Sequence, residues 1–188
     1  MKNKAYVIGI SGGSGSGKST LSNIFTEKLD NAYYICVDKH YKKELPTMIS
    51  PMDSKEYPDW NHPNTVNVGN LLKEIEEELY SHDYIVIDGA FLFCLEEVLP
   101  LLDYKIYVDA TIEMRLFRRI KRNVIEKQQT IEFIGSYYLN CARFREKEFS
   151  NPSKYLADIV IDNENGFKGE DLKAIEIIKT YKKMSLHN

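Results

Sequence analysis

The residues best suited to chemistry form a glycine-rich segment near the N-terminus, where Gly12 to Ser19 match the spacing G-x-x-x-x-G-K-[S/T]. Glycines reach backbone angles that a Cβ forbids, so successive N–H groups can turn inward around a phosphate. Lys18 would supply a mobile positive charge for the β- and γ-phosphates, and Ser19 a hydroxyl for Mg²⁺. A flexible linker has a similar composition, but a linker has no reason to lie between a strand pattern and a helix pattern. The predicted nucleotide-binding residues are therefore Gly12, Gly13, Ser14, Gly15, Ser16, Gly17, Lys18, Ser19 and Thr20.

Two aspartates stand at the ends of apolar segments that are typical of buried strands. Asp38 follows residues 33–37, and Asp88 follows residues 84–87 and precedes Gly89. In open α/β sheets, ligands bind at the carboxyl ends of the strands, so both side chains are expected near the glycine-rich loop. Asp88 has the position of the acid that holds Mg²⁺ in proteins with such a loop. The alternatives are an ordinary Asp-Gly turn at Asp88 and a loop-capping role for Asp38.

The densest positive charge lies on a helical pattern over residues 111–127, whose predicted buried stripe is Ile112, Leu116, Ile120 and Val124. A basic stretch of this kind is often a solvated face. In a chain that already needs cations for a polyphosphate, Arg119 and Arg122 are instead predicted to belong to a lid region at residues 118–130. Arg119 is expected to bind the nucleotide, and Arg122 to act in catalysis.

The elements that must position these residues alternate between strand and helix patterns. Strands are predicted at residues 5–10, 33–37, 84–89, 105–109 and 159–161. Helices are predicted at residues 18–29, 67–81, 111–127 and 130–149, the last one stopped by Asn151-Pro152, and a C-terminal helix is built on Leu172, Ile175 and Ile178. This alternation predicts a three-layer α/β fold with a parallel sheet, in the P-loop NTPase class and as a single domain over residues 1–188.

Residues 39–67 differ in character, because Pro46, Pro51, Pro58 and Pro63 interrupt any regular element. A segment of this length without a clear period is uncommon inside a compact domain and is usually functional or disordered. Trp60 and four tyrosine or histidine side chains in this segment favour a packed, ligand-facing segment over disorder.

Composition limits the remaining function classes. The 188 residues carry a net charge of −3, so no positive field points to nucleic acid or to an anionic membrane as a partner. The three cysteines are widely spaced, which disfavours disulfides and a zinc site and suggests free thiols in a reducing cytoplasm. We see no signal peptide and no apolar run of a membrane span's length.

Taken in order, the motifs resemble those of the uridine kinase and phosphoribulokinase family. The resemblance covers nearly the whole chain and rests on residues 9–20, Asp38-x-x-Tyr41, residues 60–63, Ile87-Asp88-Gly89, Arg118-Arg119-x-x-Arg122 and residues 155–161. Residues 88–93 are also similar to nicotinamide riboside kinases. The resemblance implies a five-stranded parallel sheet in the order 2-3-1-4-5 and a basic lid that closes over ATP.

The resemblance further implies roles for individual residues. Asp38 would accept the proton of the acceptor hydroxyl and help Ser19 and Asp88 to hold Mg²⁺. Tyr41, Asn61 and His62 would line the acceptor site, although His62 could merely cap the turn at Pro63.

The chain departs from the family pattern on the acceptor side. Asn61 stands where the family usually has an aspartate that grips ribose hydroxyls, and only residues 81–83 separate the second helix from the third strand, where uridine kinases place a base-recognising hairpin. Lid positions after Arg122 that often hold arginine are Lys127 and Gln129.

We therefore predict an ATP-dependent kinase that transfers the γ-phosphoryl group to a hydroxyl of a nucleoside-like or other small alcohol. The alternatives are a kinase of nicotinamide riboside or another metabolite and, from a different class, an NTP-binding switch or ATPase without an acceptor. A guanine-specific switch would need an N-K-x-D motif, which the sequence lacks.

Overall fold

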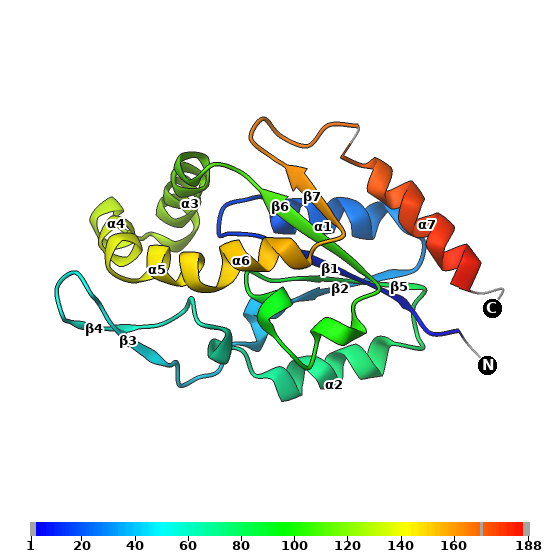
Figure 1. Ribbon diagram of the computed structural model, residues 1–188, viewed down its shortest axis with the longest axis horizontal. Helices are drawn as coiled ribbons and strands as arrows, with labels where there is room; N and C mark the ends of the chain where they lie inside the picture. The colour runs from blue at the N-terminus through cyan, green and yellow to red at the C-terminus, as the bar shows by residue number, and fades with distance from the viewer. Residues whose placement is uncertain (1–2, 170, 186–188) are drawn as a thin grey trace.

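The computed structural model describes residues 3–169 and 171–185, so both ends of the predicted domain 1–188 lie outside the described residues. Its centre is a parallel sheet of β1 (Tyr6–Ser11), β2 (Ala32–Cys36), β5 (Tyr84–Asp88), β6 (Tyr104–Asp109) and β7 (Ile159–Asp162). The strands lie in the order β2-β5-β1-β6-β7 (Figure 1). Counted within this sheet, the order is 2-3-1-4-5, which confirms the predicted fold.

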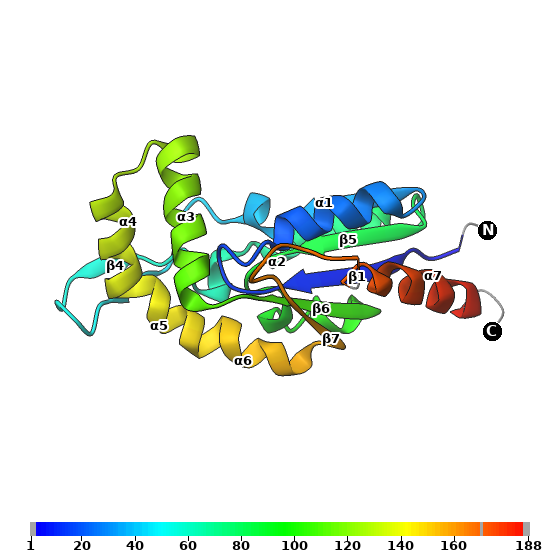
Figure 2. The same cartoon turned by 90° about the horizontal axis from the view of Figure 1, so that it is seen from above.

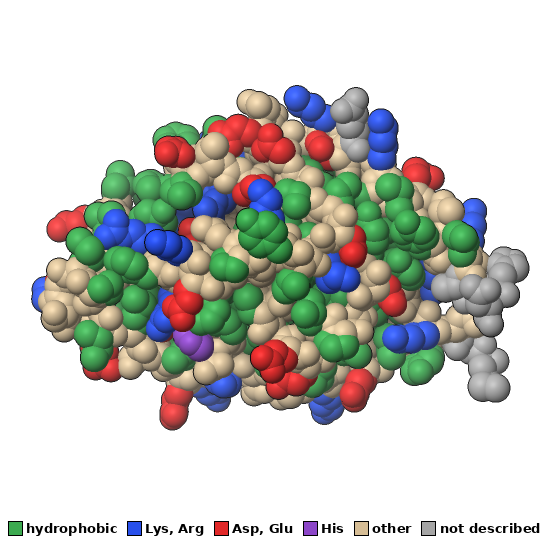
Figure 3. All heavy atoms as spheres, in the orientation of Figure 1, with side chains coloured by type: hydrophobic (Ala, Val, Ile, Leu, Met, Phe, Trp, Pro, Cys, Tyr) green, Lys and Arg blue, Asp and Glu red, His purple; other side chains and the backbone are tan. Residues whose placement is uncertain are grey.

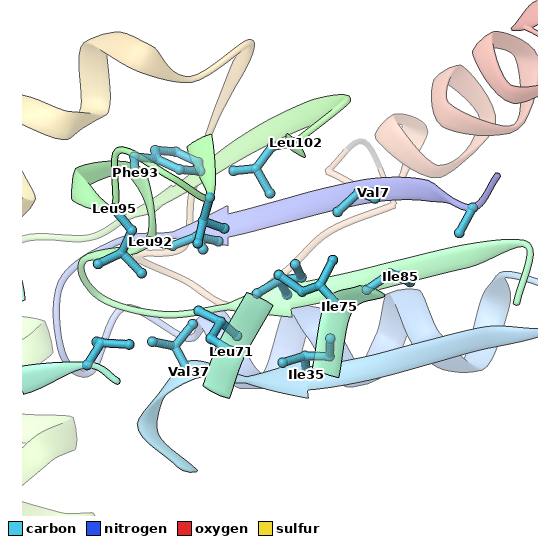
Figure 4. Packing of buried hydrophobic residues seen from close by; sticks show 14 of the residues in the cluster. Val7, Ile35, Val37, Leu71, Ile75, Ile85, Leu92, Phe93, Leu95 and Leu102 are labelled. Carbon is cyan, nitrogen blue, oxygen red and sulfur yellow. The ribbon is translucent and has the colours of Figure 1, made fainter. Parts of the chain in front are cut away.

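Each face of the sheet is covered by helices, because successive strand residues point to opposite faces. On one face, Val7 and Ile85 pack with Leu71 and Ile75 of α2 (Val68–Glu78), as Figure 4 shows. The 3₁₀ turns η3 (Leu92–Cys94) and η4 (Leu99–Leu101) complete this side. On the other face, Ile8 and its neighbours pack with α1 (Lys18–Lys28) and α7 (Lys173–Ser185). The result is the predicted three-layer arrangement.

A lid of helices stands at one end of the sheet (Figure 2). It begins with α3 (Ile112–Lys127) and continues with a run of helical turns over residues 131–156, which we call the return helix. The return helix comprises α4 (Ile131–Tyr137), η5 (Tyr138–Ala142), α5 (Arg143–Arg145), η6 (Glu146–Ser150), α6 (Asn151–Ser153) and η7 (Lys154–Leu156), of which η5 and η6 are π-helical.

Two predictions about the lid were wrong. Pro152 does not stop the return helix: the turn before it, η6, is π-helical, and the chain stays helical through Pro152 as α6 and η7. The apolar stripe of α3 is not buried either, since Ile112 is 50% exposed and Val124 is 38% exposed. The buried residues of α3 are Arg115 and Asn123, because this helix packs its polar face against the loop and the return helix.

The proline-rich segment contains a regular element that its sequence did not suggest. Strands β3 (Thr47–Ile49) and β4 (Glu56–Pro58) form an antiparallel hairpin in which Pro58 opposes Thr47. A proline is compatible with this position because the two-stranded hairpin consists only of edge strands. Met48 and Tyr57 of the hairpin pack against buried residues of the return helix, in a third apolar cluster separate from the two that cover the sheet.

The surface agrees with the small net charge. Figure 3 shows acidic and basic side chains of both signs scattered over one face of the molecule. None of the helices in the described part of the chain has the length and apolar content that a bilayer crossing requires. Cys36, Cys94 and Cys141 are free thiols, as predicted.

Candidate active site

The strand register brings the predicted chemical groups to one edge of the sheet. Asp88 at the end of β5 lies beside Ile10 of β1 and Cys36 of β2. The glycine-rich loop therefore leaves β1 next to Asp88, and Asp38 follows two residues after Cys36 in the 3₁₀ turn η1 (Val37–His40). A cavity of about 460 Å³ opens at this edge and is lined by Lys18, Ser19, Asp38 and Asp88 together.

The glycine-rich loop needs its glycines. Gly12, Gly15 and Gly17 have φ angles of 142°, 84° and 104°, which L side chains rarely adopt. The Lys18 ammonium folds back over the loop and donates to the Gly13 carbonyl at 3.2 Å. Asn163, after β7, donates from Nδ2 to the Ser16 carbonyl at 2.7 Å, so the loop is held from outside as well.

Charge is concentrated where the loop meets β5. Burial lowers the pKa of Lys18, and the carboxylates of Asp88 and Asp38 act in the opposite direction. The Asp88 side chain is buried, and its Oδ2 accepts from the Ser22 hydroxyl at 3.5 Å. In the free protein, the positive charge of Lys18 is therefore close to the negative charges of Asp38 and Asp88. When a metal-bound polyphosphate is present, Lys18 can pair with the phosphates and the aspartates can pair with the metal ion.

The residues present fit a magnesium ion. Ser19 and Asp88 line the same cavity as Asp38, and hydroxyl and carboxylate oxygens are ligands that Mg²⁺ accepts. Within residues 3–169 and 171–185, no cluster of three or more His, Cys, Asp or Glu side chains could hold a metal unaided. A usual Mg²⁺ site combines one or two carboxylates with substrate phosphates and water, and Asp88 and Asp38 could supply those carboxylates.

The other end of the cavity is aromatic and polar. Burial and the nearby carboxylate of Asp38 raise the pKa of Tyr41. The Tyr137 hydroxyl accepts from the Trp60 N–H at 3.1 Å and donates to Asn61 Oδ1 at 3.1 Å. The rings of Trp60 and Tyr137 are 5.3 Å apart. Asn61 is thus held in one orientation beside an aromatic wall.

The arginines of α3 divide into two groups. Arg119 and Arg122 line the cavity, and the Arg119 guanidinium lies 5.7 Å from the centre of the Tyr137 ring. Arg122 donates from Nε to Asn123 Oδ1 at 3.1 Å. Arg118 points elsewhere, since its Nη2 donates to the carbonyls of Asn163 and Glu164. The helical spacing therefore directs Arg119 and Arg122 toward the cavity and Arg118 away from it.

The structure brings together most of the predicted site residues but not all of them. Those that line the cavity are Ser14, Lys18, Ser19, Asp38, Tyr41, Asn61, Asp88, Arg119 and Arg122. Gly12, Gly13, Gly15, Ser16 and Gly17 shape the loop without lining the cavity, and Thr20 is exposed on α1. His62 lies outside the lining: its Nδ1 accepts from the Asn64 N–H at 3.0 Å, and its ring stacks edge-on against Phe149.

Several lining residues were not predicted as site residues. Phe133, Ile134 and Tyr137 come from α4, and Asn123 comes from α3. Their spacing indicated a helix, but no signal in the sequence says which face of that helix meets residues 59–61. Asn123 also donates from Nδ2 to Gln129 Oε1 at 2.9 Å, and this contact holds the end of α3 at the cavity rim.

A parallel sheet in this order, with a glycine-rich loop after β1 and an aspartate at the end of β5, defines the class of P-loop nucleotide-binding proteins. A crystal structure from Thermus thermophilus has a TM-score of 0.57 with this chain at 18% identity, covering 95% of this chain and 98% of its own. That similarity concerns the fold.

Sequence comparisons narrow the class. Residues 50–165 match the model of the Phosphoribulokinase / Uridine kinase family. A uridine kinase of Clostridium tetani is 29% identical over 95% of this chain and 94% of its own length. A uridine kinase of Leuconostoc citreum is 29% identical and is covered over 97% of both chains. The chain belongs to the phosphoribulokinase / uridine kinase family, and it is an ATP-dependent kinase of small molecules.

Proposed function

We propose that this enzyme transfers the γ-phosphoryl group of Mg²⁺-bound ATP to a hydroxyl group of a nucleoside, with uridine as the first candidate. The observation that carries the proposal is that Lys18, Ser19, Asp88 and Asp38 line the same cavity. Relatives that this chain covers over nearly their whole length are named uridine kinases, and this supports the choice of uridine as the acceptor.

Phosphoryl transfer depends mainly on positioning and on charge neutralisation. In the proposed mechanism, the loop N–H groups and Lys18 hold the phosphates, while Ser19 and Asp88 hold Mg²⁺, with Asp38 close enough in the cavity to assist. The magnesium ion supplies neutralisation of charge on the phosphate oxygens when it is bound. Arg119 and Arg122 reach the same space from the lid and offset the charge that develops on the transferred group.

Asp38 is the proposed general base. It lies at the carboxyl end of β2, its side chain is exposed to the cavity, and Tyr41 stands beside it. A carboxylate in this position can accept the proton of a hydroxyl that is placed between it and the γ-phosphate.

The acceptor pocket would be formed by Tyr41, Trp60, Asn61 and Tyr137. Aromatic rings suit a planar base, and Asn61 can hydrogen-bond to an oxygen of the sugar. Because Asn61 lacks the charge of a carboxylate, we expect its contact with ribose hydroxyls to be weaker than a charge-assisted hydrogen bond.

The test is phosphoryl transfer by the purified protein from MgATP to uridine, cytidine, nicotinamide riboside and pantothenate, with ADP and phosphorylated product both measured. Product formation with a nucleoside supports the proposal. ADP release at the same rate with and without acceptors would instead indicate an ATPase or a switch. Phosphorylation of pantothenate alone would reject a nucleoside acceptor.

Replacing the base tests the mechanism. Asp38→Asn should lower kcat by about 100-fold or more while ATP affinity is retained. Asp30→Asn removes an exposed carboxylate from the turn after α1 and serves as the matched control. Unchanged turnover in Asp38→Asn would show that the base is assigned wrongly.

A further inference from the structure

We propose that Arg145 and Glu146 are positioning residues, through which the return helix holds residues 59–61, which we call the acceptor segment, and the glycine-rich loop in place at the same time. This inference rests on the proposed function, because transfer between two substrates requires both halves of the site to be aligned. Figure 1 shows α4 and α5 between α3 and the β3–β4 hairpin, where contact with both halves is available.

Arg145 reaches the acceptor side. Its Nε lies 2.7 Å from Asp59 Oδ2, and the Asp59 side chain is fully buried. Asp59 Oδ1 in turn accepts from the Asn61 N–H at 3.1 Å. The carboxylate therefore fixes the backbone that carries Trp60 and Asn61 into the cavity, and Arg145 is the cation that pairs with that buried charge.

Glu146 reaches the donor side. Its Oε2 lies 3.2 Å from Arg115 Nη1, and both side chains are only 7% exposed. Arg115 lies directly against the glycine-rich loop: a Cβ on Gly13 would collide with its guanidinium, and a Cβ on Gly15 with its backbone carbonyl. Glu146 thus neutralises and holds the residue on which the loop rests.

The two residues can serve opposite sides because they are neighbours on a helix. Successive residues of an α-helix point about 100° apart, so their side chains leave the helix in different directions. Arg145 ends α5, and Glu146 begins the π-helical turn η6. A shift of the return helix would therefore displace the acceptor segment and the loop together.

Two measurements made without an acceptor distinguish the Arg145–Asp59 contact from the Glu146–Arg115 contact. Trp60 is the single tryptophan of the chain and follows Asp59 directly, so acrylamide quenching of its fluorescence reports on the acceptor segment. Titration calorimetry with MgATP reports on the loop. Neither measurement requires the acceptor to be known.

We expect Arg145→Met to increase quenching of Trp60 while the MgATP Kd stays within about 2-fold, a change of about 0.4 kcal/mol. Glu146→Gln should raise the MgATP Kd by about 10-fold and leave the quenching unchanged. The control is Glu148→Gln. Glu148 is the exposed partner of Arg145, and its Oε2 lies 2.6 Å from Arg145 Nη1. This variant should change neither the quenching of Trp60 nor the MgATP Kd.

A purely structural role would give another pattern, in which both variants alter both measurements in step with their loss of thermal stability. That result would overturn the inference. The double variant Arg115→Met/Glu146→Met removes both buried charges and should regain stability relative to Glu146→Gln. If its MgATP affinity also returned to the wild-type value, the loop would not depend on this pair.

Kinetics with a phosphorylated acceptor extend the test. Arg145→Met should raise KM for that acceptor more than KM for ATP, and Glu146→Gln should do the reverse. If no acceptor of the panel is phosphorylated, the proposed function fails, while quenching and calorimetry still decide whether the two residues position the two halves.

Discussion

The hydroxyl of Tyr137 is the best place to test how the acceptor side is held. It accepts from the Trp60 N–H and donates to Asn61 Oδ1, both at 3.1 Å. Tyr137→Phe removes both hydrogen bonds, together with a longer one that the hydroxyl accepts from Cys141 Sγ at 3.5 Å, and leaves the amide oxygen of the buried Asn61 without this partner, at a cost of about 2 kcal/mol in the free energy of unfolding. In a protein of this size, that corresponds to a fall in Tm of about 4–8 °C.

The assay is thermal unfolding followed by circular dichroism, together with KM for the acceptor that the panel identifies. We expect a lower Tm and a raised acceptor KM, because the Asn61 amide is free to rotate, with KM for ATP unchanged. Tyr138→Phe is the matched control, since no hydrogen bond involves the Tyr138 hydroxyl within the described residues. Equal Tm values for Tyr137→Phe and the control would refute the reasoning.

Three further predictions concern the loop, the lid and the core. Gly15→Ala should weaken MgATP binding by about 1–3 kcal/mol in calorimetry, because alanine is strained at a φ of 84° and its Cβ collides with the Arg115 carbonyl. Glu164 accepts from the N–H and hydroxyl of Thr111, both at 2.9 Å, which lowers its pKa below the usual 4.5. Its contribution to stability is therefore present above pH 4.5 and lost as the pH falls, so the Tm difference between the wild type and Glu164→Gln should shrink from pH 7 to pH 4. Leu71→Ala should lower the free energy of unfolding in urea by about 2–5 kcal/mol, because Leu71 is fully buried, without changing MgATP affinity.

The sheet could be predicted from the sequence because its strands are short apolar runs and most of them are separated by helix patterns. Residues 84–87, for example, are buried on both sides, and this produces the continuous apolar run. The prediction that the apolar stripe of α3 is buried was wrong. Periodicity identifies the helix, but it cannot show that Arg115 and Asn123 face the protein while Ile112 does not.

The meeting of Lys18, Ser19, Asp38 and Asp88 at one cavity could be predicted because one segment supplies the loop, Lys18 and Ser19, and the ends of neighbouring strands supply the aspartates. The acceptor half depends on contacts between residues far apart in the chain, such as Asn61 with Tyr137 and Asp59 with Arg145. A single sequence gives no sign of such pairs. For His62, the capping alternative describes its observed contact with Asn64.

The third apolar cluster has a consequence for how the molecule opens. Tyr137, Cys141 and Ala142 form a small core with Met48 and Tyr57, apart from the two cores that cover the sheet. A small core of its own allows the hairpin and the first part of the return helix, α4 and η5, to unfold locally as one unit, at a lower free energy than global unfolding. Native-state hydrogen exchange should then show amides of α4 and β4 exchanging together and well before those of β1 and β5.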